Sequence, residues 1–220
     1  MTIETKSTKE KFLDVSRDKL SMENFCKNGK LEHKKGYDVC RNVDEHGELR
    51  YDLTLIYPTS NEILPRTFGH YHTIGYVELF EVIKGKTLVI MQKEDKNPDE
   101  IEEVYIIEAE KGQKLIVLKN FGFCNINPQE KESLLLSNWI SKSVENLYQD
   151  IKDLNGFCYV AKRDVNKKIF FEKNKNYKKV PEPIKLKPKK LPKELEDLNF
   201  LSNPEKYSNL LTINNLYERI

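Results

Sequence analysis

The chain has 220 residues, which is enough for one full domain and an additional segment. Its 37 basic residues are balanced by 35 acidic ones, so the net charge of +2 gives no indication of nucleic-acid binding. No apolar run approaches the roughly 20 residues needed to cross a bilayer, and the opening residues lack the apolar stretch of a secretory signal. We therefore expect a cytoplasmic protein that binds neither nucleic acid nor membrane.

The beginning of the chain carries a weak helical pattern. Apolar side chains recur near helical spacing at Phe12, Val15 and Leu20. We expect residues 1–36 to form an N-terminal segment that contains a short helix.

The middle of the chain has the pattern of a β-sheet protein. Residues 51–58 alternate between two faces with period two, which predicts a strand half facing a core. Turn residues separate the short segments that follow, and no helical segment intervenes, so we expect an all-β antiparallel sandwich or barrel over residues 37–171. The further predicted strands are 77–83, 86–92, 102–110, 113–119 and 133–140.

The last part of the chain has a different composition. From Lys173 to Lys193 there are nine lysines, one carboxylate and four prolines, and prolines are unfavourable in helices and central strands. We expect residues 172–220 to form an extended linker or an arm on another surface, followed by short helices near 192–199 and 204–219. Aromatic residues are sparse in this stretch, which favours packing of these helices on a second subunit over nucleic-acid binding.

The cysteines give no sign of a disulfide framework. They are scattered along the chain and form no CxxC pair, which predicts reduced thiols. The four positions are Cys26, Cys40, Cys124 and Cys158.

A pair of histidines is the main candidate for chemistry. On a strand, side chains two residues apart point the same way, so His70 and His72 would project together. Gly69 allows the backbone to bend there, and Glu78 on the next strand could complete a set of two imidazoles and one carboxylate around a divalent cation. Glu81 would point to the opposite face. The alternative is a chance pair of surface histidines.

The stretch TFGHYHTIGYVELFEVIKGK resembles the first motif of the cupin superfamily, and within it the archaeal-type cupin glucose-6-phosphate isomerases. The resemblance covers about residues 37–160, with 51–92 as its most specific part. It implies a small antiparallel barrel of jelly-roll type, a metal held by His70, His72 and Glu78, and by analogy a homodimer. The metal would be Fe²⁺, Mn²⁺, Ni²⁺ or Zn²⁺.

The same resemblance implies a site for the phosphate of a sugar phosphate. Thr54 and Thr67 match hydroxyls that bind this group, and Gly69 matches a backbone amide that does so. Tyr37 matches a further tyrosine of that site. Hydroxyls and an amide that converge on one point form a phosphate site without a P-loop.

The sequence departs from the family pattern in places that bear on catalysis. Phe123 stands where the family has a fourth metal ligand, a histidine, and the adjacent Cys124 would face the other way. Phe80 replaces a tyrosine. The family's later tyrosine and histidine, which close over the substrate, are absent, and the local sequence offers Trp139 and Tyr148 instead.

These observations lead to one preferred function and two alternatives. The preferred function is metal-dependent interconversion of glucose 6-phosphate and fructose 6-phosphate, a step of glycolysis and gluconeogenesis, with Glu78 as the candidate catalytic base. The first alternative is a catalytically impaired cupin that binds a sugar phosphate or a partner protein. The second is an Fe(II) oxygenase, since two histidines and one carboxylate also form the ligand set of those enzymes.

Overall fold

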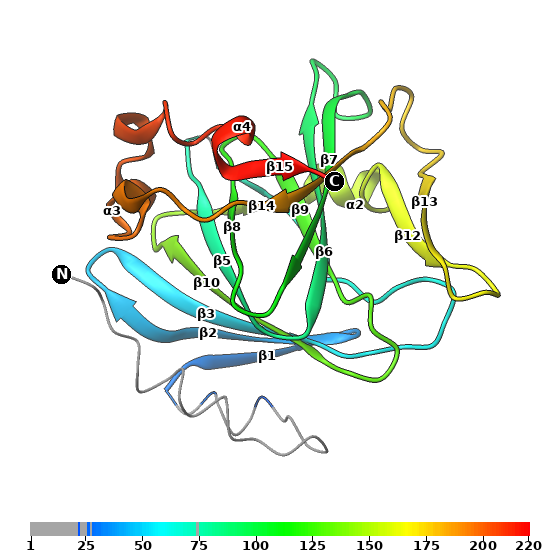
Figure 1. The fold of residues 1–220 in the computed structure, drawn as a ribbon, viewed down its shortest axis with the longest axis horizontal. Coiled ribbons are helices and arrows are strands. Elements are labelled where there is room, and N and C mark those ends of the chain that lie inside the picture. The colour runs from blue at the N-terminus through cyan, green and yellow to red at the C-terminus, as the bar shows by residue number, and fades with distance from the viewer. Residues whose placement is uncertain (1–21, 23–25, 27, 74) are drawn as a thin grey trace.

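A computed structural model describes residues 22, 26, 28–73 and 75–220. Strands dominate this part of the chain, which confirms the all-β prediction (Figure 1). The helical pattern expected around Phe12, Val15 and Leu20 lies outside the described residues.

Two sheets form the body of the molecule. The order across the six-stranded sheet is β1 (Lys30–Lys34), β2 (Tyr37–His46), β3 (Leu49–Ile56), β10 (Leu134–Ser141), β5 (Glu78–Lys84) and β8 (Lys114–Val117), all antiparallel. The order across the five-stranded sheet is β15 (Tyr217–Arg219), β14 (Ile184–Pro188), β7 (Ile101–Glu110), β6 (Lys86–Glu94) and β9 (Gly122–Ile126). Only β14 and β7 are parallel among the described strand pairs.

Smaller elements complete the fold. Two further antiparallel strand pairs are present. The first is β4 (Tyr71–His72) and β11 (Asn146–Leu147), and the second is β12 (Tyr159–Arg163) and β13 (Ile169–Lys173). The helices are α2 (Gln149–Asp153), η2 (Lys193–Leu195), α3 (Asn199–Ser202), η3 (Pro204–Tyr207) and α4 (Ile213–Leu216).

The segments that alternate with period two form strands with one face buried in the core. The six predicted strands are confirmed as β3, β5, β6, β7, β8 and β10. Val82 of β5, Met91 of β6 and Phe123 of β9 are buried in one cluster, so the inner faces of the two sheets pack together. Each buried aliphatic or aromatic side chain of this kind contributes about 1.5–3 kcal/mol by leaving water.

The lysine- and proline-rich arm is part of the body, contrary to the prediction. Ile184–Pro188 pairs with β7 on one side and β15 on the other, so the expectation that prolines exclude a central strand is wrong (Figure 1). The physical reason is their position. Pro181 and Pro183 precede the strand and Pro188 ends it, so its interior N–H groups remain free to pair.

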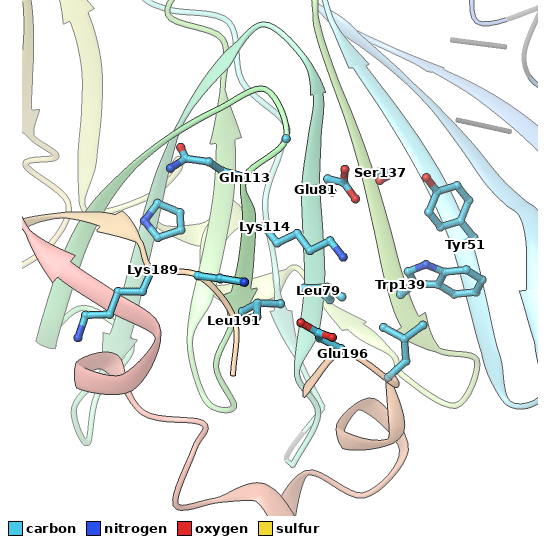
Figure 2. A pocket seen from close by; sticks show the side chains of 14 residues that line it. Tyr51, Leu79, Glu81, Gln113, Lys114, Ser137, Trp139, Lys189, Leu191 and Glu196 are labelled. Carbon is cyan, nitrogen blue, oxygen red and sulfur yellow. The ribbon is translucent and has the colours of Figure 1, made fainter. Parts of the chain in front are cut away.

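The terminal helices pack on the same chain rather than on a second subunit. Leu195, Phe200 and Leu201 are fully buried in the main cluster, and α3 contacts the outer face of β10. A cleft of about 550 Å³ remains between this extension and the sheet, where Glu81 and Trp139 face Leu191 and Glu196 (Figure 2). The prediction that these helices pack on another subunit is therefore wrong.

The cysteine prediction is wrong for one pair. Cys26 and Cys40 form a disulfide that ties the segment before β1 to β2, whereas Cys124 and Cys158 are free and buried. None of the described helices is both long and apolar enough to cross a bilayer.

The Tyr217 hydroxyl offers a test of the packing of the extension. This hydroxyl accepts a hydrogen bond from Ile116 N at 3.0 Å and donates to Ile116 O at 2.6 Å, at the edge strand β8. We expect Tyr217→Phe to lower the free energy of unfolding by about 1–3 kcal/mol, because it leaves two buried backbone groups unpaired. Denaturant unfolding measures this loss.

Tyr207→Phe is the matched control. Tyr207 is half-buried against the same cluster, and its hydroxyl has no hydrogen-bond partner among the described residues. Equal stability losses in the two variants would contradict the assigned role of Tyr217.

Candidate metal centre and substrate cavity

Three potential metal ligands from separate stretches converge at one point. His70 precedes β4, His72 ends it, and Glu78 begins β5. The Nε2 atoms of the two imidazoles lie 3.2 Å apart, and His72 Nε2 lies 3.1 Å from Glu78 Oε2. The three ligand atoms all lie within 4.8 Å of one another, and the described residues form no other such group.

These distances suit a shared cation. Donors about 2.1 Å from one ion lie about 3.0–3.4 Å apart when they are neighbours in its coordination shell. Apart from its approach to His72 Nε2, Glu78 Oε2 is buried without a hydrogen-bond partner among the described residues, a costly condition that a cation would relieve. The donor set therefore fits a divalent metal. His72 Nδ1 is also buried and unpaired, so this ligand lacks the supporting acceptor common at metal sites.

The imidazole of His70 is held in its neutral form. Burial lowers its pKa well below the usual value, and the neighbouring His72 and the guanidinium charges of Arg41 and Arg50 lower it further. Neutral imidazole is the form that binds metals, so the environment of His70 favours coordination.

Phe123, which the resemblance aligns with a fourth metal ligand, packs against the two imidazoles. It pairs with His70 through two backbone hydrogen bonds, His70 N to Phe123 O at 3.2 Å and Phe123 N to His70 O at 3.0 Å. Its ring centroid lies 4.8 Å from that of His70 and 5.5 Å from that of His72. Cys124 points into the second buried cluster, and burial raises the pKa of its thiol to about 11, so it cannot replace the histidine.

The residues matched to phosphate binding line the same cavity. Tyr37, Thr54, Thr67 and Gly69 all border a cavity of about 990 Å³ that also reaches His70 and Glu78. This volume lies at the upper end of the range for small-molecule sites. Thr67 Oγ1 accepts a hydrogen bond from Asn125 N at 3.1 Å, and the Tyr37 hydroxyl accepts one from Phe68 N at 3.2 Å, so both hydroxyls keep a hydrogen to donate.

Sequence reasoning missed the arginines of this cavity. Arg41 and Arg50 border it, and both contact the buried carboxylate of Asp52. A signal was present, because Arg50, Asp52 and Thr54 share one face of a strand by period two. In total, six basic residues and two acidic residues border the cavity, which favours an anionic ligand: Lys34, Lys35, Arg41, Arg50, Arg66 and Lys152 against Glu32 and Glu78.

Trp139 and Tyr148, the residues found in place of those that close over the substrate in the family, lie on two different surfaces. The Tyr148 ring lies 5.5 Å from that of His70 and borders the cavity, next to Lys152 of α2. Trp139 lies on the opposite face of β10, in the cleft under the C-terminal extension (Figure 2). Tyr148 is thus the aromatic residue of that stretch that borders the cavity.

Two facing sheets with a histidine–carboxylate cluster between them form the arrangement that the resemblance to cupins implies. A model of the glucose-6-phosphate isomerase (GPI) family matches residues 15–180, about three quarters of the sequence. The chain therefore belongs to this family. A search of curated proteins found no match.

Solved structures of similar fold include several cupins. A sugar phosphate isomerase of the cupin superfamily from Silicibacter pomeroyi has 14% identity and a TM-score of 0.38, with 66% of this chain and 81% of the other covered. An RmlC-like cupin from Shewanella frigidimarina has 13% identity and a TM-score of 0.37, with coverages of 53% and 86%. An oxalate oxidase has 14% identity and a TM-score of 0.44, with coverages of 64% and 65%.

Gly69 offers a test of how tightly this loop is packed. Its φ is +80°, and an added Cβ would lie 2.6 Å from Phe123 O and closer still to the Phe157 ring. Gly75 has a φ of +95° with nothing within 4 Å of such a Cβ. We expect Gly69→Ala to cost about 1–3 kcal/mol more unfolding free energy than Gly75→Ala, because both share the backbone strain but only the former adds a clash. Denaturant unfolding of both variants checks this, and equal costs would contradict it.

Proposed function

We propose that the protein is a metal-dependent aldose–ketose isomerase that interconverts glucose 6-phosphate and fructose 6-phosphate. The observation that carries the proposal is the convergence of His70, His72 and Glu78 at one wall of a cavity, because His70 and Glu78 border it together with Thr54 and Thr67. Membership of the glucose-6-phosphate isomerase family supports it.

The arrangement of the sheet leaves room for a six-carbon substrate. Thr54 pairs with Leu136, which pairs with Val82, and Glu78 lies four residues before Val82 on the same strand. Thr54 and Glu78 are thus separated by about 13 Å along the strand direction. A phosphate bound near Thr54 and Tyr37 would place the carbonyl end of the sugar toward the imidazoles.

Side chains of the cluster would bind the metal ion and transfer the proton. A divalent ion bound by His70, His72 and Glu78 would act as a Lewis acid on the sugar oxygens. The reaction moves one hydrogen between C1 and C2 and changes no net oxidation state. Glu78 is the candidate base because its carboxylate is in the cluster and one oxygen has no hydrogen-bond partner among the described residues.

A second candidate function rests on Phe123. This ring fills the place of a fourth ligand, and Phe80, 5.3 Å away between centroids, replaces a tyrosine. Both changes fit a sugar-phosphate-binding cupin that has lost catalysis. The oxygenase alternative is less well supported, because such an enzyme has no need of hydroxyls placed for a phosphate.

Removal of one imidazole tests the metal centre. We expect His72→Ala to lower the bound metal, measured by elemental mass spectrometry of the purified protein, by at least about tenfold, because one of three donors is lost. His46→Ala is the control, since His46 is exposed and outside the cluster. Equal metal content in both variants would exclude this centre.

Restoration of the fourth donor separates the two candidate functions. In a metal-replete assay with fructose 6-phosphate, we expect turnover by the natural protein and tighter metal retention against chelators in Phe123→His. Phe123→Leu controls for the change in volume. An inactive parent with an active Phe123→His variant would favour the impaired cupin over the isomerase.

A further inference from the structure

A second cationic group, formed by Arg41 and Arg50 around Asp52, borders the cavity. Arg50 Nε lies 3.0 Å from Asp52 Oδ2, and Arg41 Nη1 lies 3.3 Å from the same oxygen. The other oxygen of Asp52 accepts a hydrogen bond from Asn42 N at 2.8 Å. The Asp52 carboxylate is almost fully buried, so it fixes both guanidinium groups on the inner face of the sheet.

The register of the strands places the backbone of Arg50 level with that of Glu78, at the metal end of the cavity. Leu79, Trp139 and Tyr51 form one row across β5, β10 and β3. The next row therefore contains Glu78 and Arg50, two strands apart, which corresponds to about 10 Å between their Cα atoms. Thr54 lies four residues, or about 13 Å, further along β3. The Cα atom of Arg50 is thus nearer to that of Glu78 than to that of Thr54, while its guanidinium extends toward Asp52.

The cationic group retains unused charge and hydrogen-bond donors. Glu32 and Asp52 supply two negative charges, whereas Lys30, Lys34, Arg41 and Arg50 supply four positive ones within the same set of ion pairs. Within the part of the chain that the structure describes, neither Nη atom of Arg50 donates a hydrogen bond. An arginine with free Nη donors in a cavity suits a carboxylate or a similar oxyanion.

We propose that Arg41 and Arg50 form an anion subsite for the C1–C2 end of the sugar phosphate. This inference rests on the proposed isomerase function. When a proton leaves C2 of the aldose, its electron pair forms the C1–C2 double bond and the carbonyl pair moves to O1. The proton on O2 then passes to O1, the O2 electron pair forms the C2 carbonyl, and the pair of the C1–C2 double bond takes up the proton at C1 to complete the ketose. The subsite stabilises the negative charge on these oxygens, and it also binds a stable ligand with a carboxylate at C1.

Two stable ligands that differ in charge at C1 test whether the subsite binds an anionic group there. 6-Phosphogluconate and sorbitol 6-phosphate share the phosphate and the carbon chain, but the first carries a carboxylate at C1 and the second a neutral hydroxyl. We expect the natural protein to bind 6-phosphogluconate at least about tenfold more tightly in calorimetry, both as purified and after chelator treatment. The chelator-treated sample separates the arginine subsite from any contribution of a bound metal.

Removal of either guanidinium should reduce this preference. We expect Arg50→Gln and Arg41→Gln each to lower the affinity ratio of the two ligands by about fivefold or more, with sorbitol 6-phosphate affinity within about twofold of the parent. In each variant one arginine still neutralises Asp52, and melting temperatures verify folding. Arg219→Gln, which removes an exposed arginine outside the cavity, is the control.

The outcomes distinguish the two proposals. A ratio near one in the natural protein, or a ratio unchanged in both arginine variants, overturns the anion subsite and leaves the isomerase proposal intact if fructose 6-phosphate is turned over. Failure of both ligands to bind overturns the isomerase proposal together with the subsite.

Discussion

The backbone pairing between His70 and Phe123 is the constraint on which the rest of the site depends. It fixes the segment before β4 to β9, and Thr67 strengthens the attachment through two hydrogen bonds to the Asn125 backbone. Gly69 lies between these attachments, at a close approach to Phe157 that a side chain would prevent. One short segment therefore positions both imidazoles and two of the candidate phosphate-binding residues, Thr67 and Gly69.

The same pairing determines the character of the metal centre. Position 123 lies directly opposite position 70, so its side chain faces the imidazoles whatever residue it holds. With phenylalanine there, the donors are bordered on one side by an apolar ring, and Phe80 extends that wall. The cluster thus presents three donors on one side and leaves any further coordination to the cavity. Positive charge from Arg41 and Arg50 reaches the cluster from the neighbouring strands.

Local pattern predicted much of this structure, and the failures involve contacts between distant residues. Alternation with period two located six strands, because each has one face in the core. The resemblance to cupins brought His70, His72 and Glu78 together before the coordinates did. The arm at 184–188 was misjudged because proline content was considered without the positions of the prolines relative to the pairing N–H groups. The Cys26–Cys40 bond and the Arg41–Asp52 contact join residues that no local motif links.

The parallel pairing of β14 with β7 has a consequence for how the molecule forms. Ile184 pairs with Tyr105, and Tyr217 bonds to Ile116 from 101 positions away. During synthesis from the N-terminus, one sheet edge and the outer face of the other sheet stay uncovered until residues 184–220 leave the ribosome. The barrel with its histidine cluster precedes this segment in the chain. Residues 184–220 therefore cover a body whose strands have already been translated.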